Sequence, residues 1–324
     1  STMGRSFWRL PNLTPLYQLR QSSEQIADAD RHLFAPENAY RMRYWGGTRG
    51  ASGPEYPPAG ATIDFYLADA PDQPVTVDIR TGNGRTVRRY VGVTKQMTES
   101  ESGPPERSMK APGPIAPSTI DTFTVHTGHN RMTWDLEYPE ATPKTKGKDP
   151  YFGVYGGPMA VPGTYKVHLS VGDWVKAQSF DVKMDPRVRK SGVTQENLEA
   201  QLSLNQKILD AIGAARATAY AVDSARTHLR QAVEQGQREQ SNAQSTLDRL
   251  DTLHGKLATS TEGSYPPPKL IDQLEYLYYM TSAADQQPGS DAFARYETLE
   301  KRLSDIRSDW KQLRGDLSLP KAED

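Results

Sequence analysis

Cysteine is absent from this chain of 324 residues. The absence excludes disulfide bonds, cysteine nucleophiles and thiolate metal ligands. It does not fix the cellular compartment, although a cysteine-free composition is compatible with an exported bacterial protein.

Long apolar runs are also missing, because none approaches the ~20 residues that a membrane-spanning helix needs. The formal net charge is only −1 and the pI is near 6.6, so no overall field favours nucleic acid or an anionic membrane surface. Hydrophobic residues make up 36% and the mean hydropathy is −0.72. These values indicate a chain with a large surface, and the length allows two or three domains.

Sequence signatures of common catalytic sites are absent as well. There is no P-loop, GxSxG, HExxH or Rossmann glycine pattern, and the "GNGRTV" stretch joins two expected strands rather than a strand and a helix. His126 and His129 are the closest histidine pair, but no third ligand is spaced to complete a metal site, so loop-tip polar residues are expected there. The sequence predicts no catalytic residue, no metal and no cofactor in this chain.

Residues 55–188 carry the period-two pattern of β-strands. Ile63, Phe65 and Leu67 alternate with polar residues, and a Gly-Asn-Gly turn separates two further alternating runs. We expect an antiparallel β-sandwich of immunoglobulin or fibronectin type. The basic "RTVRR" on the return strand (85–89) fits either a surface for an acidic partner or ordinary charge protection of an exposed strand.

The pattern changes to a helical period from Thr194 onward, so residues 189–324 are expected to form about four helices. Thr194 is a suitable N-cap, and Gly236 is a plausible stop for one long helix. Two proline- or glycine-containing breaks then separate three shorter helices, the last with a seven-residue apolar repeat. We predict antiparallel neighbours in a bundle with coiled-coil character.

Aromatic residues supply the candidate contacts with other molecules. Tyr278 and Tyr279 belong to "YLYY", whose tyrosines cannot all face one core if the segment is helical. Trp174 follows a turn and is a candidate exposed platform for a sugar ring. Trp134 alternates with Met132 and Leu136, so a place in the core is expected instead.

The first residues read as one strand without a partner. Ser6–Leu10 form this strand within "STMGRSFWRL", and Pro11 follows at once. Arg5, Ser6, Phe7 and Trp8 are therefore predicted to pair with another domain or chain. Residues 1–54 as a whole are expected to be this terminal strand followed by an extended linker.

Several segments together resemble the C-terminal region of secreted bacterial β-propeller proteins with BNR or sortilin (VPS10-like) repeats, often labelled glycosyl hydrolases. The segments that carry the likeness are "GRSFW" (4–8), "LTPLYQL" (13–19), "AYRMR" (39–43), "GNGRTVRRY" (82–90), "HNRMTWDLEYP" (129–139), "GGPMAVPGTYKVHLSVGDW" (156–174), "FDVKMDPRV" (180–188) and "TQENLEAQLSLNQKILDAIGAA" (194–215). Met3, Arg9 and Pro11-Asn12 depart from the family's usual His, Ile and Asp-Asp. The resemblance implies a last propeller strand, an immunoglobulin-like module and a helical tail.

The leading hypothesis is a non-catalytic structural or interaction region of a larger exported protein, either periplasmic, on the outer surface or extracellular. Its partner would be a β-propeller domain or chain that completes the sheet of the first strand, with further subunits contacted through the helices. The alternatives are a sialidase-like glycoside hydrolase whose catalytic propeller lies outside this chain, and a carbohydrate-binding β-sandwich. No nucleic-acid partner and no membrane span are expected.

Overall fold

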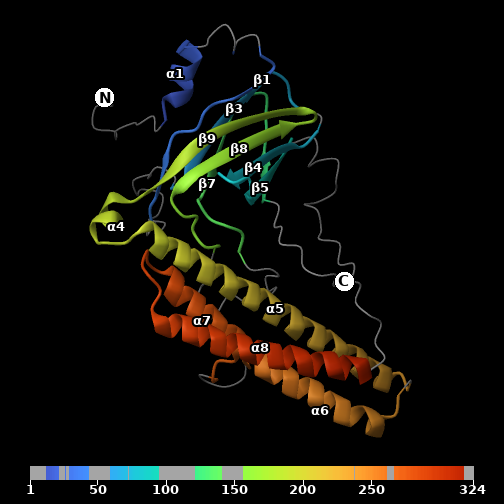
Figure 1. The fold of residues 1–324 in the computed structure, drawn as a ribbon. Helices are drawn as coiled ribbons and strands as arrows, with labels where there is room; N and C mark the ends of the chain where they lie inside the picture. The colour runs from blue at the N-terminus through green and yellow to red at the C-terminus, as the bar shows by residue number, and fades with distance from the viewer. Residues whose placement is uncertain are drawn as a thin grey trace, which may run out of the picture. The chain divides into compact units, whose positions relative to one another are not determined.

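The computed structural model describes residues 12–21, 26, 29–43, 59–71, 73–94, 121–140, 156–236, 238–260 and 266–316. These residues form an α+β protein with two compact units, a β unit and a helical unit (Figure 1). The expected strand at residues 6–10 lies outside the described residues. In the described part of the chain, no helix is long and apolar enough to cross a membrane.

The β unit contains a three-stranded sheet in the order β1-β3-β7. Its strands, all antiparallel to their neighbours, are β1 (Arg31–Leu33), β3 (Ala61–Leu67) and β7 (Gly128–Trp134). Alternation places Ile63, Phe65 and Leu67 on one face of β3, and all three are almost fully buried. The short helix α1 (Thr14–Gln21) is tied to the segment after β1, where Gln18 Oε1 accepts from the Ala35 amide at 2.9 Å.

The second sheet has six strands in the order β2-β9-β8-β4-β5-β6 and curls in Figure 1. Its strands are β2 (Ala39–Arg41), β4 (Val75–Thr81), β5 (Thr86–Val93), β6 (Asp121–Thr124), β8 (Gly163–Val171) and β9 (Trp174–Met184). The β2–β9 and β5–β6 pairs are parallel. The expectation of a purely antiparallel β unit is wrong at these two pairs. In both pairs a long stretch of chain connects the two strands, and only a long connection allows neighbouring strands to run parallel.

An aromatic cluster joins the two sheets. Trp134 on β7 is fully buried, and its ring centroid lies 5.1 Å from that of Tyr165 on β8 and 6.2 Å from that of Phe180 on β9. The indole Nε1 donates to the Glu137 carbonyl at 3.0 Å, which satisfies the buried donor. The prediction that Trp134 lies in the core is therefore confirmed. A small helix, α4 (Pro186–Lys190), follows β9.

The helical unit is built on α5 (Gln195–Glu234), a helix of 40 residues. Three shorter helices follow it: α6 (Gln240–Leu257), α7 (Leu270–Ser282) and α8 (Ser290–Asp316). Thr194 caps α5 as expected, because its hydroxyl accepts from the Asn197 amide while the Asn197 side chain accepts from the Thr194 amide. Gly236, with φ of +67°, follows the last turn, so the predicted stop is confirmed.

Helices α6 and α7 lie one after the other along α5, and both run antiparallel to it (Figure 1). Arg226 pairs with Asp251 of α6, whereas Arg216, nearer the start of α5, pairs with Glu275 of α7. Leucine, isoleucine, valine and alanine side chains from all four helices form one continuous core. The expected antiparallel order thus holds for α5 with α6 and with α7, but α6 and α7 follow each other in the same direction.

A buried polar network joins α5 to the end of α7. Gln201 Nε2 donates to the carbonyls of Thr281 at 2.8 Å and Ala284 at 2.6 Å, and the Thr281 hydroxyl donates to Asn205 Oδ1 at 2.5 Å. These groups satisfy one another's hydrogen-bonding capacity. The network therefore fixes the register of the two helices.

Candidate functional site

The outer face of the six-stranded sheet carries a cluster of charges around one buried carboxylate. Asp78 on β4 is 5% exposed. Arg89 on β5 donates two hydrogen bonds to its carboxylate, from Nε to Oδ1 at 2.6 Å and from Nη2 to Oδ2 at 2.8 Å. Arg80 Nη2 donates a third to Oδ2 at 2.9 Å. Burial opposes ionisation of Asp78, but the bonds from Arg89 and Arg80 outweigh it, and the pKa of Asp78 is below its ordinary value.

Strand register explains why these residues meet. Arg89 stands directly opposite Asp78 in the β4–β5 hairpin, and His168 of β8 stands opposite Asp78 on the other side. Lys166 of β8 stands opposite Arg80. Burial lowers the pKa of His168, and repulsion from Arg80 lowers it further. This cluster is therefore cationic, because Arg80, Arg89 and Lys166 surround Asp78, whose carboxylate already accepts from both arginines.

A second buried carboxylate lies on the outer face of the three-stranded sheet. Asp64 on β3 is 3% exposed and accepts from Arg131 Nε at 2.7 Å and from Asn12 Nδ2 at 3.2 Å. Its Oδ1 also lies 2.8 Å from His129 Nε2. His129 is thus a residue of strand β7 that stands beside an acid, and the expectation of a loop-tip histidine is wrong for it.

An Asp–His pair is part of many nucleophilic sites, because the acid orients the ring and the ring takes a proton from a hydroxyl or thiol. Within the described ranges, no hydroxyl or thiol is hydrogen-bonded to His129, and no group of three His, Asp or Glu residues is arranged to hold a metal ion. Arg131 and Asn12 take the remaining acceptor positions of Asp64. The pair therefore ties Asn12 and β7 to β3 and lacks the third member that nucleophilic catalysis requires.

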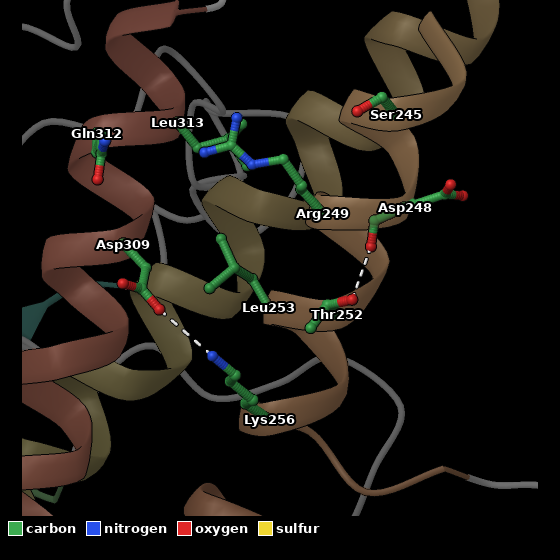
Figure 2. Close-up of a pocket in the computed structure, with 9 residues that line it drawn as sticks. All are labelled: Ser245, Asp248, Arg249, Thr252, Leu253, Lys256, Asp309, Gln312 and Leu313. Carbon is green, nitrogen blue, oxygen red and sulfur yellow. Dashed lines mark hydrogen bonds and ion pairs between the residues drawn. The ribbon is translucent and has the colours of Figure 1, made fainter.

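A groove of about 590 Å³ lies between α6 and α8 in the helical unit (Figure 2). Leu253 and Leu313 form its apolar part, and Lys256 Nζ reaches Asp309 Oδ2 across it at 3.3 Å. The other charges that line it, Asp248 and Arg249, also balance. The groove is lined by two acidic and two basic side chains, so its charges balance. Its lining therefore does not favour a ligand of either charge.

The sequence-predicted contact residues fall in different places. Trp174 begins β9 and is half-buried, and Tyr279 of α7 is 45% exposed. Tyr278 is only 2% exposed, so its expected role at the surface is corrected. It lies on the same helical face as the buried Leu274 and Thr281, and its hydroxyl donates to the Gly156 carbonyl at 3.3 Å. Arg5, Ser6, Phe7 and Trp8 lie outside the described residues.

The outer edge of β9 is a feature that sequence reasoning missed. β8 pairs with β9 from Trp174 to Val182, but on the opposite side β2 pairs only with Val182–Met184. The Asp181 amide donates away from β8, to Asn38 Oδ1 at 2.9 Å. Because backbone groups alternate in direction along a strand, those of Val175, Ala177 and Ser179 point to the same open side.

Comparisons with protein-family models, with curated proteins and with solved structures find no match for this chain.

Proposed function

We propose that this chain is a non-catalytic interaction region of a larger exported β-propeller protein, and that it docks on the propeller or on a partner subunit. The immunoglobulin-like module expected from the sequence would be the platform for one contact, and the helices, with the coiled-coil character of their seven-residue repeat, a platform for another. The observation that carries the proposal is the open edge of β9 at Val175, Ala177 and Ser179.

Strand addition suits this edge for a physical reason. An unpaired edge offers a row of N–H and C=O groups, and an extended segment from a partner gains main-chain hydrogen bonds there. In the described part of the chain, no backbone group pairs with the outward side of these three residues. Val175 is 58% exposed on the same stretch, so apolar surface accompanies the free backbone groups.

Charge along the edge indicates the kind of segment that fits. Lys176 is exposed on β9, and its charge lowers the pKa of His32 on β1, after the larger effect of burial. Arg31 of β1 donates from Nη1 to the Val171 carbonyl at 3.0 Å, so a second cation lies beside the β8–β9 turn. A partner strand with carboxylates near Lys176 and Arg31 is complementary to these two cations, and one rich in lysine is not. Exposed acids stand only at the two ends of the open stretch, Asp173 in the turn and Asp181 after Ser179.

The proposal is tested by amide hydrogen exchange on the whole chain with two synthetic peptides, one alternating valine with glutamate and one alternating valine with lysine. We expect the glutamate peptide to slow exchange at Val175, Ala177 and Ser179, and the lysine peptide to leave it unchanged. Ala177→Pro removes one outward N–H without removing a bond to β8, so it abolishes the effect, whereas Ala177→Ser keeps the N–H and the effect. Unchanged exchange at all three amides with the glutamate peptide would overturn the proposal.

A further inference from the structure

The cationic cluster on the outer face of the six-stranded sheet is separate from the β9 edge and calls for its own explanation. We propose that Arg80, Arg89 and Lys166 form a binding site for a small oxyanion, that is, a carboxylate or a phosphate group. The site lies across the neighbouring strands β5, β4 and β8 and does not depend on the strand-addition surface.

The two arginines are held in place before a ligand arrives. Arg80 and Arg89 converge on one carboxylate, and that carboxylate, Asp78, is itself buried at 5% exposure. A guanidinium fixed in this way loses less conformational entropy when it binds an anion than a free surface arginine does. A fixed donor pair is what distinguishes this cluster from scattered surface charge.

Arg89 has hydrogen-bond donors that Asp78 does not use. A guanidinium has five N–H groups, and Arg89 uses one on Nε and one on Nη2 for Asp78. Three N–H groups of Arg89 remain, and its side chain is 52% exposed, so they face solvent. This leaves an edge of the guanidinium with the fork geometry that binds a carboxylate or phosphate through two parallel hydrogen bonds.

The cluster carries a net positive charge. Arg80 and Arg89 against Asp78 leave one positive charge, and Lys166, opposite Arg80 in the register, adds another. Lys166 is exposed, and its side chain makes no hydrogen bond or ion pair among the described residues. The neighbouring cross-strand rows on this face hold Thr76 and Ser170 on one side of the cluster, and Thr164 and Asp181 on the other. Asp181 is the one carboxylate among these four residues, and it accepts a hydrogen bond from the Thr164 hydroxyl at 2.9 Å.

His168 provides an internal reporter of the site. It is flanked by Asp78 and Arg80 on β4 and by Lys166 on its own strand, and its β9 neighbour is Ala177, which does not titrate. An anion bound between the arginines and Lys166 favours the charged imidazolium, so it raises the pKa of His168 from its lowered value. By the same linkage, the anion binds more tightly as the pH falls through that pKa.

The experiment titrates sodium phosphate and sodium acetate separately into the whole chain at constant ionic strength, with NMR detection of backbone amides and of the His168 ring. We expect saturable shifts confined to β4, β5 and β8 with at least one of the two anions, and an upward shift of the His168 pKa. Which anion saturates decides between phosphate and carboxylate. Shifts that do not saturate, or an unchanged His168 pKa with both anions, would overturn the proposal.

Variants separate the site from general charge effects. Arg89→Gln is expected to weaken binding by about tenfold, which corresponds to loss of one charge-assisted hydrogen-bonding group. Because Arg89 also supports Asp78, Lys166→Gln is the second test, and it weakens binding several-fold without removing a bond of the fold. Lys183→Gln removes the same charge from the β2 end of β9 and is the control. Equal affinities for the Lys166 and Lys183 variants would contradict the site.

Discussion

The ring of Trp134 and the ring of Tyr165 lie 5.1 Å apart, centroid to centroid, and join the two sheets of the β unit. Trp134→Ala removes the largest fully buried side chain of this core, and we expect it to lower the free energy of unfolding of the β unit by about 3–5 kcal/mol. Chemical denaturation followed by circular dichroism measures the change. Trp174→Ala, at a half-buried position, is the control and costs much less; equal losses would mean that Trp134 does not hold the sheets together.

Acid is expected to destabilise the β unit partly through Asp78. The pKa of this carboxyl is lower in the folded chain than in the unfolded chain, because the bonds from Arg89 and Arg80 outweigh its burial. Its stabilising contribution is therefore complete above the unfolded value of 3.8 and is lost as the pH falls through the folded value.

Asp78→Asn removes this ionisation while keeping the shape of the side chain. We expect a loss of about 1.5–3 kcal/mol near neutral pH, and a flatter dependence of stability on pH below 4 than in the unchanged chain. Urea unfolding between about pH 2.5 and 7 gives both quantities. Parallel acid profiles for the two proteins would show that Asp78 does not take part.

Glu275 is expected to have the opposite pH dependence in the helical unit. Burial raises the pKa of Glu275 above its ordinary value of 4.5, despite the hydrogen bond from Arg216. A carboxyl whose pKa is higher in the folded chain contributes most below its unfolded pKa, and this contribution is lost as the pH rises through the folded value. Glu275→Gln removes this ionisation but leaves the largely buried Arg216 without its carboxylate, so we expect a loss of stability that is larger near pH 4 than at neutral pH.

Removal of the basic partner has a different outcome. Arg216→Met leaves the Glu275 carboxylate buried without the ion pair at 2.6 Å, so we expect a loss of about 3–5 kcal/mol at neutral pH and a smaller loss at pH 4, where protonation is easier. Thermal unfolding at both pH values distinguishes the two cases. A loss independent of pH would assign the effect to packing rather than to charge.

The N-terminal cap of α5 is expected to contribute measurably to the helical unit. Thr194→Ala removes an acceptor for the Asn197 amide, and the expected cost is about 1 kcal/mol. Thr298→Ala on α8 is the matched control, because that hydroxyl donates only to the carbonyl of Ala294 one turn back, so its loss is near neutral. Denaturant unfolding of both variants compares them; equal changes would mean that the capping box adds nothing.

The sequence predicted those elements whose signal is local. The period-two runs on both sides of the Gly-Asn-Gly turn predicted β4 and β5, and Gly84 has the positive φ of +91° that such a turn requires. The long helical period predicted α5. Strands β1 and β6, with three and four residues, are too short to show alternation, so they were not predicted. The parallel β2–β9 pair depends on contacts about 140 residues apart, which no local pattern encodes.

The same distinction applies to the charged clusters. The hairpin turn brings β4 and β5 together, but a β-bulge between Ile79 and Arg80 shifts the register by one residue and thereby places Arg89, rather than Arg88, opposite Asp78. The turn is visible in the sequence and the bulge is not, so the sequence predicts the hairpin but not this pair. The partners of Asp64 lie 52 and 67 residues away on separate elements. Neither the burial of Asp64 nor its contact with His129 has a signature in the sequence.

Residues 31–41 limit where the β unit can be separated from the chain before it. Residues 31–41 contain both β1, at the edge of the three-stranded sheet, and β2, at the edge of the six-stranded sheet. A fragment that begins at residue 55 would lose both, and would expose β3 and the end of β9 as bare edges. Exposed edges template the association of identical chains, so a β unit that keeps both of these edge strands has to include Arg31.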